Sequence, residues 1–276
     1  MDRIKYIEDF CKKERIGDNS VLYALIRCLD VSDAVQILKR SFSGNLVLRD
    51  ASLKIVLEHS SNNWLEIHDN LIRDIIREFA KLSPKHRGRA FYCLGELSQF
   101  APSKTRQDIL NFLLMSRYAL GRRKGLKIIT QAEISHFRKE IEKCAFTHGE
   151  TKAVLILIQH TEPTYLYENR GKLLNILEEG WAVGRLYLRI AEYDPTCIDE
   201  LRNIDGITFA YAKAKLNQAL SSDEAMSLIE QFHHDERFGL LVWAIGKMNH
   251  WDVLLYVADN YERWLSERTL KNYQQR

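Results

Sequence analysis

The chain has 276 residues, of which 46% are hydrophobic and 28% are charged, and its formal net charge is +3. This composition excludes a disordered polypeptide and is typical of a globular protein that buries a sizeable core. The longest apolar run, residues 153–158, is far shorter than the roughly 20 residues of a membrane-spanning helix. We therefore expect a soluble protein that does not enter a membrane.

The five cysteines are scattered along the chain, and no two of them form a Cys-x-x-Cys pair. A chain of this length folds without disulfide bonds, so we expect reduced thiols. The first 15 residues are charged every few positions and lack the apolar segment of a signal peptide. Together these features predict a cytoplasmic location.

Apolar residues recur at helical spacing along almost the whole chain, and the alternation typical of strands is absent. The four prolines stand where helices are expected to begin. A polar loop is predicted at residues 59–63, and a break near Asn260. The clearest predicted helices cover residues 2–13, 47–58, 64–79, 89–97, 133–146, 150–160, 163–178, 181–193, 196–203, 206–220, 222–233, 235–248 and 250–272.

A small residue followed four positions later by an apolar one recurs in these helices, most clearly in the segment Gly121–Thr130. Four positions make about one helical turn, so both residues share a face and a neighbouring helix can approach the small one closely. Successive copies are 26 to 39 positions apart, a spacing that indicates stacked helical hairpins. The copies are Ala51/Ile55, Ala90/Leu94, Gly125/Ile129, Ala153/Leu157, Gly184/Leu188, Ala210/Ala214 and Gly239/Trp243.

Basic residues precede the small residue in several copies, as in Arg87–Ala90, Arg122–Gly125 and Lys152–Ala153. With its paired helices and prolines near helix starts, the chain resembles a HEAT or armadillo-like α-solenoid over roughly residues 45–250. The resemblance implies an all-α, right-handed superhelical stack of antiparallel helix pairs.

The last three copies depart from this pattern, because Val183, Phe209 and Phe238 replace the basic residue. We nevertheless expect one helical repeat domain over residues 1–276, with a basic part reaching to about residue 130 and shorter repeats after it. A stack of this kind leaves a long groove in which a partner can bind.

Charge is unevenly distributed, with a net charge of −1 over residues 1–80, +9 over 81–130 and −5 over 131–276. Clustered bases can neutralise the phosphates of a nucleic acid or bind an acidic peptide. They can also be ordinary solvated helix starts, or pair internally with acids such as Glu96 and Asp108. The candidate binding residues are Lys85, Arg87, Arg89, Arg117, Arg122, Arg123, Lys124, Lys127 and Lys152.

Other combinations of reactive side chains favour structural roles. We interpret residues 233–236, His-His-Asp-Glu, as a polar loop and not a metal site, because consecutive helical residues point about 100° apart. Cys144, four residues before His148, is expected to be a buried structural cysteine. The P-loop, nucleophile-elbow, dinucleotide-binding and zinc-protease motifs are missing from the sequence, so we expect no cofactor and no catalytic residue.

The C-terminal third is rich in aromatic residues, which are expected either to pack in the core or to form an anchor surface for a partner. They are Trp181, Trp243, Trp251, Tyr256, Tyr261 and Trp264.

These features predict a non-enzymatic scaffold that binds another protein or an acidic peptide in its groove. The alternative is a nucleic-acid-binding protein that uses the basic residues between 85 and 127. HEAT-like DNA glycosylases extend that alternative to an enzyme, although the similarity is one of fold alone and no catalytic residue carries over.

Overall fold

In the computed structural model, which describes residues 3–13, 24–25, 27–41, 46–178 and 180–261, the chain is all-α and no described residue lies in a strand. It forms two compact units, residues 1–144 and 145–276. The first unit contains α1 (Arg3–Lys13), α3 (Val31–Ser41), α4 (Leu46–Asn62), α5 (Glu66–Glu78), η1 (Phe79–Lys81), α6 (Pro84–Leu97), α7 (Ser103–Leu114), α8 (Ala119–Ile128), α9 (Gln131–Ile134) and most of α10 (Arg138–Phe146). The second contains α11 (Thr151–His160), α12 (Pro163–Leu174), α13 (Gly180–Ile190), η2 (Pro195–Asn203), α14 (Gly206–Lys215), α15 (Ser222–Phe232), α16 (Phe238–Lys247) and α17 (Trp251–Tyr261).

Helix starts follow local sequence signals. Pro84, Pro163 and Pro195 occupy the first turns of α6, α12 and η2, where a missing backbone N–H costs little. Ser221 and Glu224 form a reciprocal capping box at the start of α15. The predicted role of these prolines as helix openers is therefore confirmed.

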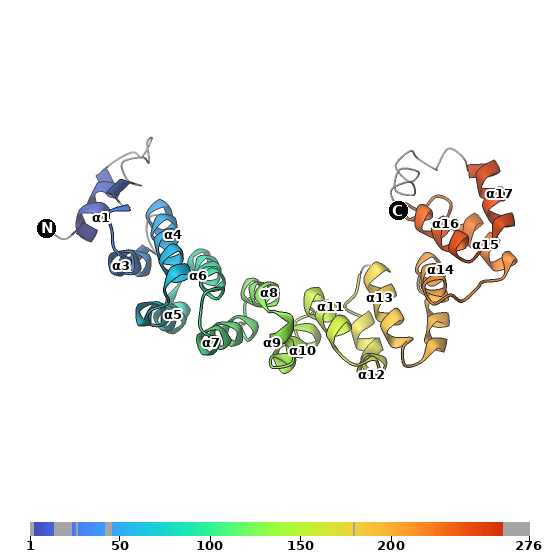
Figure 1. Cartoon of the computed structure of the whole chain (residues 1–276), viewed down its shortest axis with the longest axis horizontal. Helices are drawn as coiled ribbons and strands as arrows, with labels where there is room; N and C mark the ends of the chain where they lie inside the picture. The colour runs from blue at the N-terminus through green and yellow to red at the C-terminus, as the bar shows by residue number, and fades with distance from the viewer. Residues whose placement is uncertain (1–2, 14–23, 26, 42–45, 179, 262–276) are drawn as a thin grey trace. The chain divides into compact units, whose positions relative to one another are not determined.

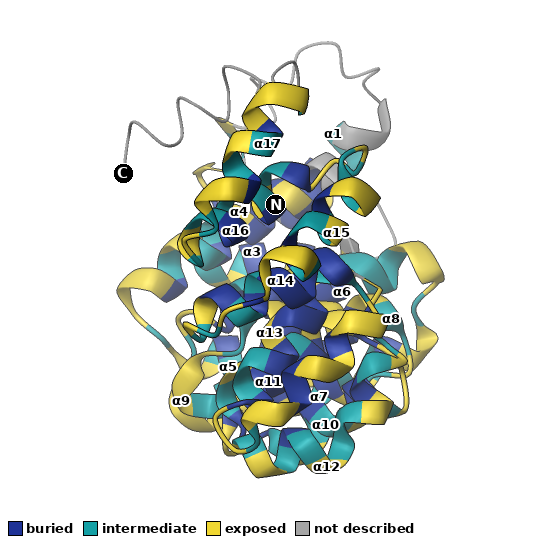
Figure 2. Cartoon of the chain, turned by 90° about the vertical axis from the view of Figure 1, so that its right-hand side faces the viewer, coloured by how far each residue is buried: buried dark blue, intermediate teal, exposed yellow. Residues whose placement is uncertain are grey.

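Within each unit, alternate helices contact one another. In the first unit α4 packs on α6, and α6 packs on α8. In addition, α3 packs on α4 and α7 packs on α8. In the second unit α11, α13, α14 and α16 form an unbroken series of contacts. Figure 2 shows that the helices have a buried side and an exposed side, as amphipathic helices require.

The helices of these two series are the ones that carry the small residues of the sequence pattern. Ala90, Ala153 and Ala210 are fully buried. A methyl group added to Gly125 would lie 3.0 Å from Leu114, and one added to Gly184 would lie 2.8 Å from Thr208. The predicted close approach at the small residues is confirmed at these positions.

The polar loop predicted at residues 59–63 is wrong, because α4 continues to Asn62. Ser60 and Ser61 donate their hydroxyls to the carbonyls of Leu57 and Glu58, three residues earlier. Serine side chains, whose composition predicts a loop, therefore bond to the helix's own backbone here and leave the helix unbroken.

Further predicted boundaries need correction, among them those at residues 206–220 and 133–146. The helix predicted at 206–220 ends at Lys215, and Asn217 follows in the left-handed region with φ of 54°. The segment predicted as a helix at 133–146 is broken by a turn before Arg138. The last predicted helix, 250–272, is described only as far as Tyr261, and its remainder, like Trp264, lies outside the described residues.

Among the residues that the structure describes, none of the helices combines the length and the hydrophobicity needed to cross a lipid bilayer. The cytoplasmic location and the single repeat domain over residues 1–276 stay predictions.

Candidate binding groove

Part of the predicted basic cluster is engaged in contacts inside the first unit. On α6, Arg89 lies 3.3 Å from a carboxylate oxygen of Asp50 on α4. Arg87 is half-buried and holds its guanidinium carbon 4.7 Å from the centre of the Tyr118 ring. Both guanidinium groups thus join neighbouring segments of the fold.

The bases of α8 are partly internal as well. Arg122 has only 6% of its surface exposed and donates to the carbonyl of Ser116, just beyond the end of α7, at 3.1 Å. Lys124 lies 2.9 Å from a carboxylate oxygen of Glu96 on α6, which is the internal pairing allowed for by the sequence. These two residues contribute to packing, so their positive charges are of little use to an outside partner.

The other members of the predicted set are exposed. Arg117 precedes α8, and Lys152 belongs to α11 of the second unit. The prediction that all nine residues form one continuous strip stays untested. The exposed members are Lys85, Arg117, Arg123, Lys127 and Lys152.

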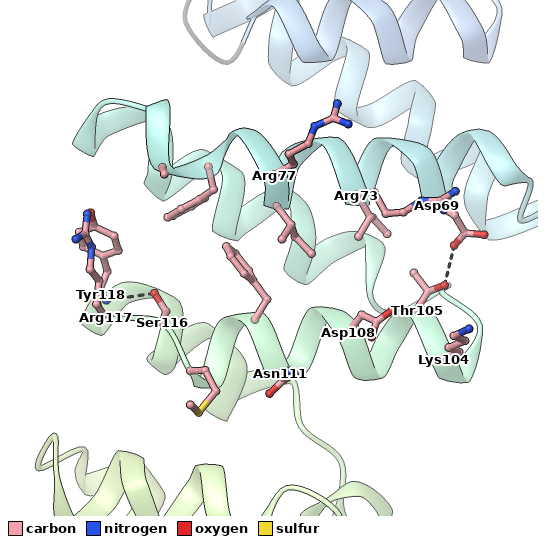
Figure 3. A pocket seen from close by; sticks show the side chains of 16 residues that line it. Asp69, Arg73, Arg77, Lys104, Thr105, Asp108, Asn111, Ser116, Arg117 and Tyr118 are labelled. Carbon is pink, nitrogen blue, oxygen red and sulfur yellow. Dashed lines mark hydrogen bonds between the residues drawn. The ribbon is translucent and has the colours of Figure 1, made fainter.

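The first unit has a groove of about 1040 Å³ between α5 and α7 (Figure 3). Its inner wall is apolar and its edges are polar or charged. The lining side chains include Ile72, Ile76, Phe79, Phe112 and Met115, and the charged residues Asp69, Arg73, Arg77, Lys104, Asp108 and Arg117.

The apolar wall is part of a rigid aromatic cluster. The ring of Phe79 lies 4.7 Å from that of Phe91 and 5.2 Å from that of Phe112, the latter edge to face. Phe91 is buried in the core, whereas Met115 at the groove has 47% of its surface exposed. The groove therefore offers a preformed apolar surface backed by the core.

Both ends of the groove are fixed by side-chain contacts, and Figure 3 shows the one between Thr105 and Asp69. At one end the Thr105 hydroxyl donates to Asp69 at 2.7 Å, so that α7 is joined to α5. At the other end Arg87 and Arg117 both lie against the Tyr118 ring, at 4.7 and 4.8 Å from its centre. The site is therefore shaped by bonded elements of the fold.

Cations outnumber anions along this groove, with four arginine or lysine side chains against two aspartates. One of those aspartates, Asp69, already accepts hydrogen bonds from Trp64 and Thr105, which spreads its charge into the protein. Arg77 is itself paired with Asp74 at 2.6 Å. The positive charge that faces a ligand therefore comes from Arg73, Lys104 and Arg117, and a ligand that carries carboxylates is favoured beside them.

Sequence reasoning identified Arg117 but missed the rest of this groove. Ile72 and Ile76 were read as core positions because of their helical spacing, and Ile72 is indeed buried. Arg73 directly follows Ile72, and Arg77 directly follows Ile76, so the arginines have the same four-residue spacing as the isoleucines. That juxtaposition of apolar and basic stripes on one helix was the available signal.

The remaining chemical candidates have structural roles. Residues 233–237 form the turn between α15 and α16, as predicted. Cys144 is fully buried and its thiol lies 3.4 Å from the Leu114 carbonyl, which confirms it as a core residue. Over the described ranges, no three histidine, cysteine or acidic side chains gather in a way that could hold a metal ion.

Comparison with known proteins finds no match for this chain among protein-family models, curated proteins or solved structures. The groove and the charges around it therefore carry the functional argument.

Proposed function

We propose that this protein is a non-enzymatic scaffold that binds an acidic, apolar segment of another protein in the groove between α5 and α7. The observation that carries the proposal is the combination of an apolar wall with a cationic rim on adjacent helices. An amphipathic helix that buries leucine-like side chains and directs carboxylates to the rim would match both features.

The size of the groove supports a polypeptide ligand. At about 1040 Å³ it reaches the upper end of the range for small-molecule sites, roughly 300–1,000 Å³.

The same proposal extends to the architecture. We infer that the alternate helix contacts continue as a right-handed superhelical stack of the HEAT or armadillo-like kind, in which α5 and α7 belong to successive hairpins. In such a stack, grooves between neighbouring helices are the usual surface for extended or helical partners.

The test is selection of a phage-displayed peptide library on the full chain, with counter-selection on the Arg73→Glu/Met115→Glu variant. Both substituted side chains are exposed, so the variant is expected to fold. Enriched peptides should combine Asp or Glu with apolar residues at helical spacing, and should bind the variant at least tenfold more weakly in fluorescence anisotropy. Peptides that bind the wild type and the variant equally would refute the groove as the site.

The alternative proposal is nucleic-acid binding by the basic residues between 85 and 127, including the glycosylase-type enzyme. It is supported by α8, which contains no acidic residue and exposes Arg123 and Lys127. Anisotropy titrations with duplex DNA, single-stranded DNA and RNA should then show affinity that falls steeply with salt and is lost in Arg123→Glu/Lys127→Glu. A lack of binding at low salt would eliminate this alternative.

A further inference from the structure

Charge is segregated among the helices of the second unit. Residues 145–276 contain 19 Asp and Glu against 14 Lys and Arg. Nevertheless the four contacting helices α11, α13, α14 and α16 contain no acidic residue, and each carries one or two lysines or arginines. The unit has a net negative charge, yet the charged residues of this one series of helices are all basic.

On three of these helices an aromatic residue is followed four positions later by a cation, and these cations are all exposed. The guanidinium carbon of Arg185 lies 5.5 Å from the centre of the Trp181 ring. Lys215 holds its ammonium 5.4 Å from the Tyr211 ring and 5.2 Å from the Trp243 ring. We call the following six residues the aromatic–basic ladder: Trp181 and Arg185 on α13, Tyr211 and Lys215 on α14, and Trp243 and Lys247 on α16.

The ladder residues of α14 and α16 are directly adjacent, because the rings of Tyr211 and Trp243 lie 5.5 Å apart and share Lys215. Lys247 stands one helical turn beyond Trp243 and is exposed. Two rungs of the ladder therefore form one patch.

The rung on α13 lies on the same side. Gly180 of α13 lies next to Asp205 at the start of α14, and Gly184 lies next to Thr208. Because the later residue of one helix contacts the later residue of the other, the two helices run in the same direction. Successive residues of a helix are rotated by about 100° around its axis. Trp181, three residues before Gly184, is therefore about 60° from it in one sense, and Tyr211, three residues after Thr208, is about 60° from it in the opposite sense. Gly184 and Thr208 face each other between two parallel helices. Rotations in opposite senses therefore place Trp181 and Tyr211 on the same side of the helix pair.

We propose that the aromatic–basic ladder binds single-stranded nucleic acid, as a second site apart from the groove of the first unit. Bases would stack on the rings of Trp181, Tyr211 and Trp243, and the phosphates would pair with the neighbouring cations. Each nucleotide offers a flat base and an anionic phosphate, which are the two groups that an aromatic residue and a cation recognise.

The chemistry favours this ligand over two competitors. Duplex DNA keeps its bases stacked inside, so the three rings would have nothing to stack on. An acidic peptide would satisfy the cations but would leave the indole of Trp181, which is 52% exposed, without a matching group. A single strand satisfies rings and cations together.

The experiment is a fluorescence-anisotropy titration of the full chain with labelled oligo-dT and oligo-U, repeated at several salt concentrations. The ladder variant Arg185→Glu/Lys215→Glu should bind at least tenfold more weakly, with a log–log salt slope reduced by roughly 1.4 for two lost phosphate contacts. Trp181→Ala should weaken binding by roughly 5- to 150-fold, the range for the loss of one stacked base.

Matched controls separate the ladder from general charge. Lys172→Glu/Arg202→Glu makes the same charge change at exposed residues of α12 and η2, and Trp251→Ala removes an indole that is 70% exposed on α17. Both controls should keep wild-type affinity. Equal losses in ladder and control variants, tighter binding of a duplex, displacement of the strand by polyglutamate, or no binding at low salt would each overturn the proposal.

Discussion

The guanidinium of Arg106 and the carboxylate of Glu133 form a two-point ion pair between α7 and α9, with Nε 2.5 Å from Oε1 and Nη2 3.0 Å from Oε2. The same guanidinium donates to the carbonyls of Ser98 and Ile128, at the ends of α6 and α8. Although partial burial opposes ionisation, the hydrogen bonds from Arg106 and Thr130 lower the pKa of Glu133 from 4.5 to about 2. One side chain thus links four helices of the first unit.

Replacing Arg106 with alanine should lower the free energy of unfolding by about 3 kcal/mol, because it leaves a partly buried carboxylate and two carbonyls without their donor. Urea unfolding followed by circular dichroism measures the change. Arg138→Ala is the control, since its ion pair with Glu142 is a half-exposed contact within one helix and should contribute less than about 1 kcal/mol. Equal unfolding midpoints for the two variants would contradict the central role of Arg106.

We expect His68 to make the first unit sensitive to mild acid. Its side chain is fully buried, and its Nδ1 lies 3.0 Å from the backbone N–H of Leu65, which caps α5. Burial lowers the pKa of His68 below its ordinary value of 6.5. The unfolded chain therefore binds this proton first, so stability is complete above pH 6.5 and falls as the pH drops from 6.5 towards the lower folded-state pKa.

His68→Gln keeps an acceptor for the Leu65 N–H at the position that capping boxes reserve for Gln or Glu, but it does not titrate. The difference in unfolding free energy between about pH 7.5 and about pH 5.5 should therefore be smaller in this variant than in the wild type. Identical pH dependence in both proteins would show that other groups are responsible.

Gly184 lies where α13 approaches α14 closely. A methyl group there would lie 2.8 Å from the Thr208 Cγ2, and Thr208 is held by its hydroxyl, which donates to Asp205 at 2.7 Å. Gly184→Ala should therefore destabilise the protein by roughly 1–3 kcal/mol. Adding Thr208→Ser removes the clashing methyl group and should recover part of the loss in a double-mutant cycle.

The control for this effect is Gly171→Ala in α12, where an added methyl group meets nothing within 4 Å. Because alanine is the better helix former, this substitution should stabilise the protein by roughly 0.5–1 kcal/mol. If both alanine variants were stabilised, the small-residue pattern would not reflect close helix packing.

The adjacent arginines Arg122 and Arg123 of α8 should differ strongly in their response to charge reversal. Arg122→Glu places an acid in a site that is 6% exposed and removes the donor to the Ser116 carbonyl, so it should destabilise the first unit by about 3 kcal/mol. Arg123→Glu, at an exposed position, should change stability by less than about 1 kcal/mol. Thermal unfolding of the two variants decides this, and similar losses would contradict it.

The sequence was sufficient to predict the all-α class and most helices, because helical periodicity and proline caps are local signals. Gly184 and Gly125 could be recognised as packing positions for the same reason. By contrast, the end of α4 was misread, since the serines at 60 and 61 favour loops by composition yet bond back to the helix here.

The candidate site was less accessible to sequence reasoning. Clustered charge identified the bases near residue 122, but only the fold shows that Arg122 points into the protein while Arg123 faces solvent. The groove brings together Ile76 and Phe112 from different helices, a pairing that depends on tertiary contacts. Charge patterns along a chain therefore locate a cluster of bases better than they predict which of its side chains are exposed.

The contacts of the second unit pass from α11 to α13, α14 and α16 in turn, and this arrangement affects how the unit comes apart. When contacts join only neighbouring helices, folding does not depend on one nucleus. Cooperativity then extends only between adjacent helices. Fraying should begin at the outermost helix and advance inward, and amide exchange should be slowest in the middle of the series, at α13 and α14.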